Sequence, residues 1–128
     1  MTLLTALLTF AFGGPWCAFA QQVPVTPGVQ IDRAGNGVPV INIVAPNGRG
    51  VSHNQYQRFD VGREGVILNN ARGISATQLG GHIEGNPNLA PGQSARIIVN
   101  EVTSTHPSAL RGFTEVVDFH LKLPLGFD

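Results

Sequence analysis

The sequence contains little cysteine and little charge. Its single cysteine, Cys17, falls in the first twenty residues, so a secreted form that starts after Ala20 would have no disulfide. Charged residues make up 12% of the chain, and eight basic side chains balance eight acidic ones. This balance offers no basic region that would bind nucleic acid or anionic lipid. The four histidines stand alone in the sequence, which excludes the ligand spacing of a structural zinc site. We therefore expect no metal, no cofactor and no nucleic-acid partner.

The first twenty residues contain no charged side chain. Leu3 to Phe12 is a short apolar run, and Ala18-Phe19-Ala20 has the small-x-small pattern of a signal-peptidase site. Gly13-Gly14-Pro15 interrupts the run, and a helix needs about 20 apolar residues to span a bilayer, more than this run has. No Lys or Arg precedes it. We predict a signal peptide over residues 1–20 and export through the inner membrane, with a membrane anchor as the alternative.

The remaining composition is rich in turns, with 16 Gly and 9 Pro in the whole chain. No stretch after the signal has the i, i+3, i+4 apolar pattern of a helix. Strong strand patterns are centred near Ile41, Ile67, Ile98 and Glu115, spaced by about 17 to 31 residues, in the range of coil-by-coil solenoids. A small β-sandwich would give similar strands. The pattern alone predicts an all-β fold and leaves these two architectures open.

Two polar stretches lie between the strands. Residues 51–60 are polar with aromatic residues interspersed, and we interpret them as a loop or as short edge strands. Asn86-Pro87-Asn88-Leu89 follows Gly85 as a sharp turn, because Pro87 keeps Asn86 out of the helical region and asparagine side chains bond nearby backbone groups. Asparagines near strand ends are expected to stack as hydrogen-bonding ladders between coils; these are Asn42, Asn69, Asn70, Asn86, Asn88 and Asn100.

Catalytic patterns are also missing from the sequence. No serine has the context of a nucleophile elbow, and no glycine-rich phosphate loop precedes a Lys-Ser/Thr pair. Acidic residues come close in sequence only as Asp60 with Glu64 and Glu115 with Asp118, which is weak support for the carboxylate pair of a glycosidase. We predict that the chain is not an enzyme. A β-helix polysaccharide-degrading enzyme is a minor alternative.

Several blocks of sequence between Asn36 and about Val116 occur together in a characteristic order. The blocks are Asn36 to Ile43, Gly50 to Tyr56, Phe59 to Val61, Gly65 to Asn70, Thr77 to Gly81, Gly85 to Leu89 and Val99 to Ser104. Any one of them is unspecific, whereas the ordered set is highly specific. In this order they resemble a known family, the N-terminal two-partner secretion domains of filamentous haemagglutinin-type and contact-dependent growth-inhibition exoproteins.

The resemblance implies a right-handed parallel β-helix with N-terminal capping strands. It implies that the domain is recognised in the periplasm by an outer-membrane transporter of β-barrel type with periplasmic domains, which passes the exoprotein to the cell surface or the medium. Asn86, Pro87, Asn88 and Leu89 match a family motif that matters for secretion, and they are our predicted transporter-recognition motif. Proteins led by such domains act as adhesins, haemagglutinins, haemolysins or toxins. A glycan-binding adhesin is therefore the alternative function.

The resemblance ends near the C-terminus. The family continues after the equivalent of Glu115-Val116 into a second motif, Asn-Pro-Asn-Gly-Ile, which is missing here. We therefore expect a secretion domain over residues 21–116 that is incomplete at its C-terminus, followed by a divergent tail over residues 117–128. An incomplete β-helix leaves backbone groups unpaired at its open end. We expect the isolated fragment to be marginally stable or to self-associate.

Overall fold

The computed structural model describes residues 20–118, which form nine strands and no helix. Residues 1–19 of the predicted signal peptide and residues 119–128 of the predicted tail lie outside the described residues, whereas Val117 and Asp118, the first two residues of that tail, belong to the last strand. In chain order the strands are β1 (Gln22–Pro24), β2 (Gln30–Arg33), β3 (Pro39–Asn42), β4 (Val51–Phe59), β5 (Val66–Asn70), β6 (Ser75–Thr77), β7 (Gly81–Ile83), β8 (Ile97–Val102) and β9 (Thr114–Asp118). The all-β prediction is confirmed.

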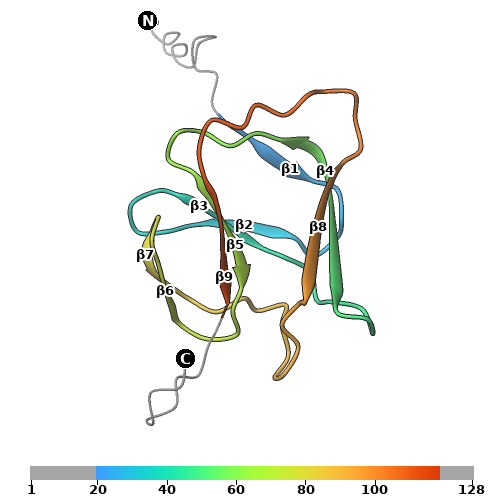
Figure 1. Cartoon of the computed structure of the whole chain (residues 1–128), viewed down its shortest axis with the longest axis vertical. Coiled ribbons are helices and arrows are strands. Elements are labelled where there is room, and N and C mark those ends of the chain that lie inside the picture. Colours follow the sequence, from blue (N-terminus) through green and yellow to red (C-terminus); the bar gives the residue numbers. More distant parts are fainter. Residues whose placement is uncertain (1–19, 119–128) are drawn as a thin grey trace, which may run out of the picture.

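Two parallel ladders organise the fold (Figure 1). In one sheet β3, β5 and β9 run parallel, with Ile41 opposite Leu68 and Leu68 opposite Val116. In the other sheet β4 and β8 run parallel, with Asn54 opposite Asn100. Parallel partners require a long crossover, and here the chain passes from one sheet to the other before it returns. This pairing favours stacked coils over a sandwich of antiparallel strands, while the right-handed sense of the coil stays a prediction.

Antiparallel strands cover the start of each ladder. β1 pairs with β4, and β2 pairs with β3 along its whole length, from Gln30 opposite Asn42 to Arg33 opposite Pro39. Pro39 therefore stands at the start of its strand, where a residue without an N–H is tolerated. A separate hairpin of β6 and β7 projects beside the sheet that contains β5 and β9. The prediction of capping strands at the N-terminal end agrees with this arrangement.

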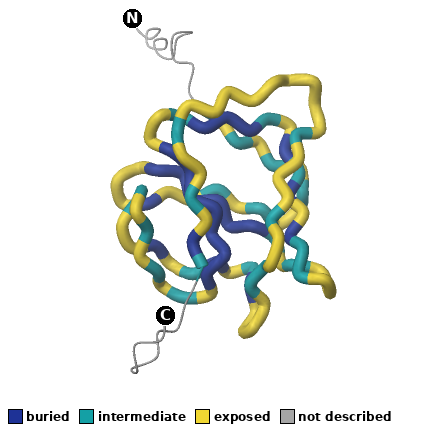
Figure 2. Tube along the Cα trace, viewed as in Figure 1, coloured by how far each residue is buried: buried dark blue, intermediate teal, exposed yellow. Residues whose placement is uncertain are grey.

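The core lies between the sheets, where Figure 2 shows the deepest burial. All four residues of β3 and all five of β5 are buried, as expected for central strands that are covered on both faces. One of two clusters of buried apolar side chains joins the two sheets, and its members are Ile41, Ile43, Tyr56, Phe59, Val61, Val66 and Leu68. Burial of this apolar surface is the main driving force that holds the coils together.

Our interpretation of residues 51–60 as a loop or short edge strands was wrong. Val51–Phe59 is the longest described strand and lies in the middle of its sheet. Its inward positions include the fully buried polar residues Ser52 and Asn54, so the usual apolar alternation is hidden in the sequence. Both side chains bond Val44, because Ser52 Oγ donates to the Val44 carbonyl over 2.7 Å and Asn54 Oδ1 accepts the Val44 N–H over 3.0 Å. These bonds satisfy the buried polar groups.

Candidate functional site

The predicted motif forms a tight turn that is anchored mainly by Asn86. This side chain is only 2% exposed. Its Nδ2 donates to the carbonyls of Ile43, at 2.9 Å, and Asn69, at 2.8 Å. Its Oδ1 accepts the N–H of Asn88 over 2.8 Å, and its backbone N–H donates to the Ala71 carbonyl over 2.7 Å. Asn86 thereby joins the ends of β3 and β5 to the turn, and both hydrogens of its amide are used.

The next three residues of the motif differ in exposure. Pro87 is exposed, Asn88 is half-buried and Leu89 is buried. Asn88 Nδ2 donates to the carbonyls of Ile43, at 3.0 Å, and Gly28, at 2.9 Å, which fixes the turn against the segment that leads into β2. Asn88 Oδ1 accepts no hydrogen bond from the described residues. The turn thus presents one proline ring and one free amide oxygen at the surface.

Beneath the turn, asparagines bond across neighbouring coils. Asn42 and Asn69 lie opposite each other in β3 and β5, and Asn69 Nδ2 donates to Asn42 Oδ1 over 3.0 Å. Asn42 in turn donates to a carboxylate oxygen of Asp32 over 3.0 Å. The expected ladder is confirmed at this pair. Asn86, by contrast, bonds backbone carbonyls from outside the strands, so its role is to anchor a turn and not to extend a ladder.

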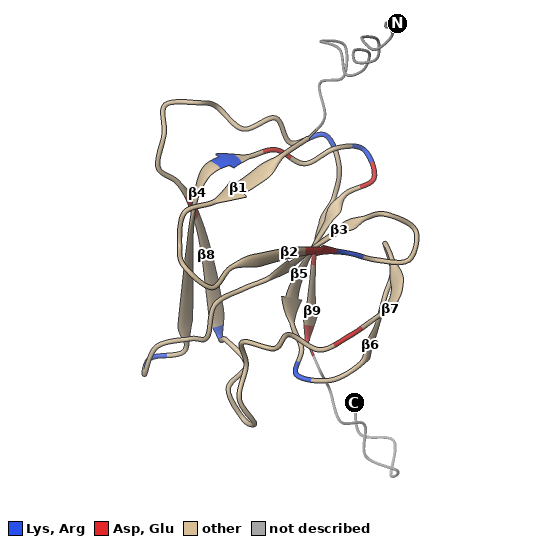
Figure 3. Cartoon of the chain, turned by 180° about the vertical axis from the view of Figure 1, so that it is seen from behind, with Lys and Arg blue, Asp and Glu red and all other residues tan. Residues whose placement is uncertain are grey.

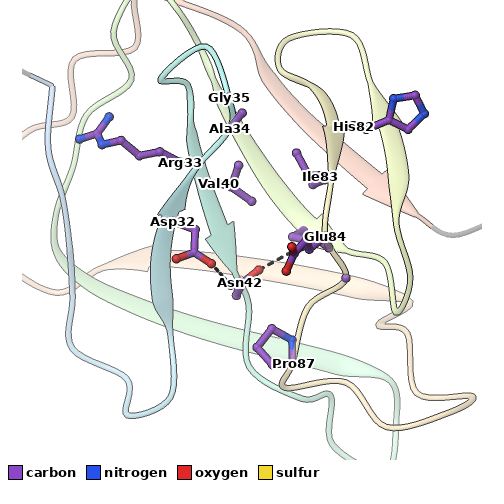
Figure 4. A pocket seen from close by; sticks show the side chains of 12 residues that line it. Asp32, Arg33, Ala34, Gly35, Val40, Asn42, His82, Ile83, Glu84 and Pro87 are labelled. Atoms are coloured by element: carbon purple, nitrogen blue, oxygen red, sulfur yellow. Dashed lines mark hydrogen bonds between the residues drawn. The ribbon is translucent and has the colours of Figure 1, made fainter.

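A pocket of about 400 Å³ opens beside the turn (Figure 4). Pro87 forms part of its wall, together with Ile83 and Glu84 from the end of β7 and Asp32 from β2. Val40 contributes an apolar surface. The pocket therefore combines apolar lining with carboxylates next to the exposed residue of the motif, and it is large enough for a side chain of a binding partner.

Glu115 and Asp118, which are close in sequence, both accept hydrogen bonds within the fold. Glu115 accepts the N–H groups of Gln78 and Leu79 over 2.9 and 3.0 Å, and Asp118 accepts from Asn70 over 2.5 Å. These bonds hold β9 to the hairpin region and to β5. The geometry therefore offers no specific support for a catalytic carboxylate at this end of the described chain.

Asp60, which the sequence pattern pairs with Glu64, is a buried carboxylate. It is 5% exposed, and its two oxygens accept the Ala109 N–H over 3.0 Å and the Arg58 Nε–H over 2.7 Å. Burial raises the pKa of Asp60, but the Ala109 amide and the Arg58 guanidinium outweigh that effect and hold the pKa below its usual value. Asp60 thus fastens the long segment between β8 and β9 to the end of β4.

The described residues contain no group of three side chains that could hold a metal ion and no helix long and apolar enough to cross a membrane. Acidic and basic positions are interspersed along the described chain (Figure 3). A glycan-binding surface needs exposed aromatic rings. Among the described residues, Tyr56 is 0% exposed and Phe59 is 7% exposed, whereas Phe113 is 80% exposed. Phe119 and Phe127 lie outside the described residues. A single exposed ring gives little support to a stacking surface for sugars.

The stacked, capped sheets with an anchored asparagine-proline turn define an all-β domain built from coils. A family model described as "TPS secretion domain", where TPS denotes two-partner secretion, matches residues 18–118. The chain belongs to this family. A crystal structure of the filamentous hemagglutinin secretion domain is similar, with a TM-score of 0.67 and 44% identity over 74% of this chain and 31% of that one.

Named relatives agree with the family assignment. The "16S rRNA endonuclease CdiA" of Enterobacter cloacae is 50% identical over 88% of this chain, and a "tRNA nuclease CdiA" of Escherichia coli is 49% identical over 89%. A hemolysin of Serratia marcescens is 39% identical over 96%. The chain spans only 4% of each CdiA protein and 8% of the hemolysin. The chain therefore corresponds to the secretion domain of haemagglutinin- and CdiA-type exoproteins.

Proposed function

We propose that this chain is a recognition module without catalytic activity, bound in the periplasm by an outer-membrane transporter of β-barrel type that exports it to the cell surface or the medium. Membership of the two-partner secretion family supports a transporter as partner. One observation supports the turn Asn86–Leu89 as the location of this contact: its exposed Pro87 sits next to Asn86, whose side chain is fixed by buried hydrogen bonds.

Within this turn the four residues have different roles. Asn86 and Leu89 are buried and hold the turn in place, so their contribution to binding is indirect. Pro87 and Asn88 Oδ1 face the partner, since the ring is exposed and the oxygen is free to accept a hydrogen bond. The adjacent pocket receives a side chain of the transporter.

Strand pairing adds to this contact. β2 is the outer strand of its sheet among the described residues, and it begins just after Gly28, whose carbonyl is bonded by Asn88. A strand of the transporter's periplasmic domains that adds to β2 by β-augmentation lies close enough to contact Pro87 as well. Recognition by backbone pairing together with one turn explains how a transporter binds a surface without a strong charge pattern.

The test compares Pro87→Ala with Asn86→Ala in binding to a purified two-partner secretion transporter of one of the Escherichia coli relatives. Pro87→Ala is expected to weaken binding about tenfold or more, as hot-spot truncations do, while thermal melting shifts little. Gln93→Ala, in an exposed turn of the same loop, is the matched control and should bind normally. Unchanged affinity of Pro87→Ala would exclude direct contact at this turn.

A further inference from the structure

The sequence contains two Asn-Gly pairs, Asn36-Gly37 and Asn47-Gly48. Both lie in exposed turns of the described chain, the first between β2 and β3 and the second between β3 and β4. An asparagine that precedes glycine is prone to cyclise, because the glycine nitrogen can attack the side-chain amide and glycine has no Cβ to obstruct it. Since the two turns share this dipeptide, their different hydrogen bonds determine which of them reacts.

In the first pair both reacting nitrogens are already bonded. The Gly37 N–H, which would supply the attacking nitrogen, donates to the Ala34 carbonyl over 2.9 Å. Asn36 Nδ2, the nitrogen that would leave, donates to the Leu79 carbonyl over 2.8 Å. From the described residues Asn36 Oδ1 accepts one N–H, that of Val38, over 3.2 Å. Cyclisation at this pair therefore requires two hydrogen bonds to break first, which opposes the reaction.

In the second pair both reacting nitrogens are free. Neither the Gly48 N–H nor Asn47 Nδ2 has a hydrogen-bond partner among the described residues. A Cβ built on Gly48 would meet nothing within 4 Å, so the turn is open around the attacking nitrogen. Both residues are exposed (Figure 2), and solvent can therefore exchange the protons that the reaction needs.

The side-chain oxygen of the second pair is held by two donors. Asn47 Oδ1 accepts the N–H of Arg49 over 2.8 Å and the N–H of Val51 over 3.1 Å. Negative charge develops on this oxygen when a nitrogen adds to Cγ, and two backbone N–H groups at these distances stabilise it as an oxyanion hole does. The donors are kept in place by the turn itself, in which the Asn47 N–H donates to the Val51 carbonyl and the Gly50 N–H donates to the Asn47 carbonyl, each over 2.9 Å.

We propose that Asn47 is a site of spontaneous deamidation that the folded turn promotes. The Gly48 nitrogen loses its proton to water and forms a bond to Cγ of Asn47. The Cγ–Nδ2 bond then breaks, and ammonia leaves with a proton from solvent. Water opens the resulting succinimide ring at either of its two carbonyls, which yields aspartate or isoaspartate. The net change is the loss of ammonia and the gain of water, and no oxidant or cofactor takes part.

The two products have different consequences for the fold. Aspartate keeps an oxygen for the N–H groups of Arg49 and Val51, and it adds one negative charge to a chain of zero net charge. Isoaspartate lengthens the backbone by one atom, which displaces the bonds between Asn47 and Val51. This turn leads into β4, the middle strand of its sheet, so we expect the isoaspartate form to unfold at a lower urea concentration. The site lies outside the turn Asn86–Leu89 and does not depend on the transporter contact.

The test incubates the folded chain at neutral pH and follows both asparagines by mass spectrometry. Trypsin cleaves after Arg33 and Arg49, and the peptide of residues 34–49 contains both pairs. Fragment ions assign the mass increase of an amide-to-acid conversion to one asparagine or the other. We expect Asn47 to react at least about tenfold faster than Asn36 in the folded chain. In concentrated urea the two rates should converge, because unfolding removes the hydrogen bonds that distinguish the pairs.

Gly48→Ala is the matched variant, because a Cβ on the attacking residue hinders cyclisation while the open space around Gly48 leaves the fold intact. It should slow the reaction at Asn47 severalfold, and circular dichroism verifies its folding. Two results would overturn the proposal. One is a folded chain in which Asn36 reacts as fast as Asn47. The other is an Asn47 that reacts more slowly in the folded chain than in urea, since the turn would then protect the side chain.

Discussion

Replacing Asn86 by alanine tests whether this side chain is the anchor of the turn. The change removes three hydrogen bonds in a buried setting, to the Ile43 carbonyl, the Asn69 carbonyl and the Asn88 N–H, each between 2.8 and 2.9 Å. A typical intramolecular hydrogen bond contributes about 1 kcal/mol net, so the expected loss of stability is about 3 kcal/mol. For a domain of about 100 residues that lowers Tm by roughly 12–24 °C.

The assay is urea unfolding followed by circular dichroism. Asn100→Ala is the matched control, because it removes the same group from an exposed position without a described side-chain bond and should stay within about 0.5 kcal/mol of the unaltered chain. Asn86→Asp should destabilise at least as much as Asn86→Ala, since a carboxylate would face two carbonyl oxygens. If Asn86→Ala were as stable as Asn100→Ala, the anchoring role would be wrong.

Three further predictions concern other parts of the core. Asp60 has a lowered pKa in the folded chain, so its contribution to stability is present above its unfolded pKa and is lost as pH falls through the folded value. Asp60→Asn should reduce this acid-dependent loss of stability in denaturation curves measured from neutral to acid pH. An unchanged pH profile would refute this prediction. The Tyr56 hydroxyl is buried without a hydrogen-bond partner and burial raises its pKa; Tyr56→Phe should leave the urea midpoint unchanged or raise stability by about 1 kcal/mol, and a clear loss would contradict this. A Cβ on Gly112 would collide with the carbonyl oxygen of Gly62, so Gly112→Ala should lower the free energy of unfolding by about 2 kcal/mol or more. Gly48 has open space around it, so Gly48→Ala should lower stability little in the same thermal melt.

Apolar runs made the central strands predictable from sequence. The patterns around Ile41 and Ile67 have β-branched residues on both faces, and these segments became β3 and β5, buried on both sides. The turn at Asn86 was equally readable, because proline and asparagine act locally on the backbone. The pairing of these strands was not readable from pattern alone, since partners lie 27 or more residues apart and a sandwich gives the same strand count.

The segment that became β4 shows where such reasoning fails. A strand pattern depends on apolar residues at alternate positions, whereas the inward positions of β4 carry Ser52 and Asn54 as well as Tyr56. Both polar side chains are stable in the interior only because Val44 offers its N–H and its carbonyl to them. That compensation comes from a bend after β3, and the residues of β4 themselves carry no sign of it.

In the recognition motif Asn86–Leu89, one feature could be predicted from sequence and another could not. Its local sequence predicts a turn, and one side chain at each end of that turn proves to be buried. The roles of Asn86 and Pro87 separate only through contacts of Asn86 with residues 17 and 43 positions earlier in the chain, since these contacts determine which side chain has all its hydrogen bonds made and which is exposed. Loss of secretion on changing either residue would therefore have two different causes, a displaced turn for Asn86 and a missing contact for Pro87. Measuring stability and transporter affinity on the same variants distinguishes them, because a displaced turn lowers both quantities and a missing contact lowers affinity alone.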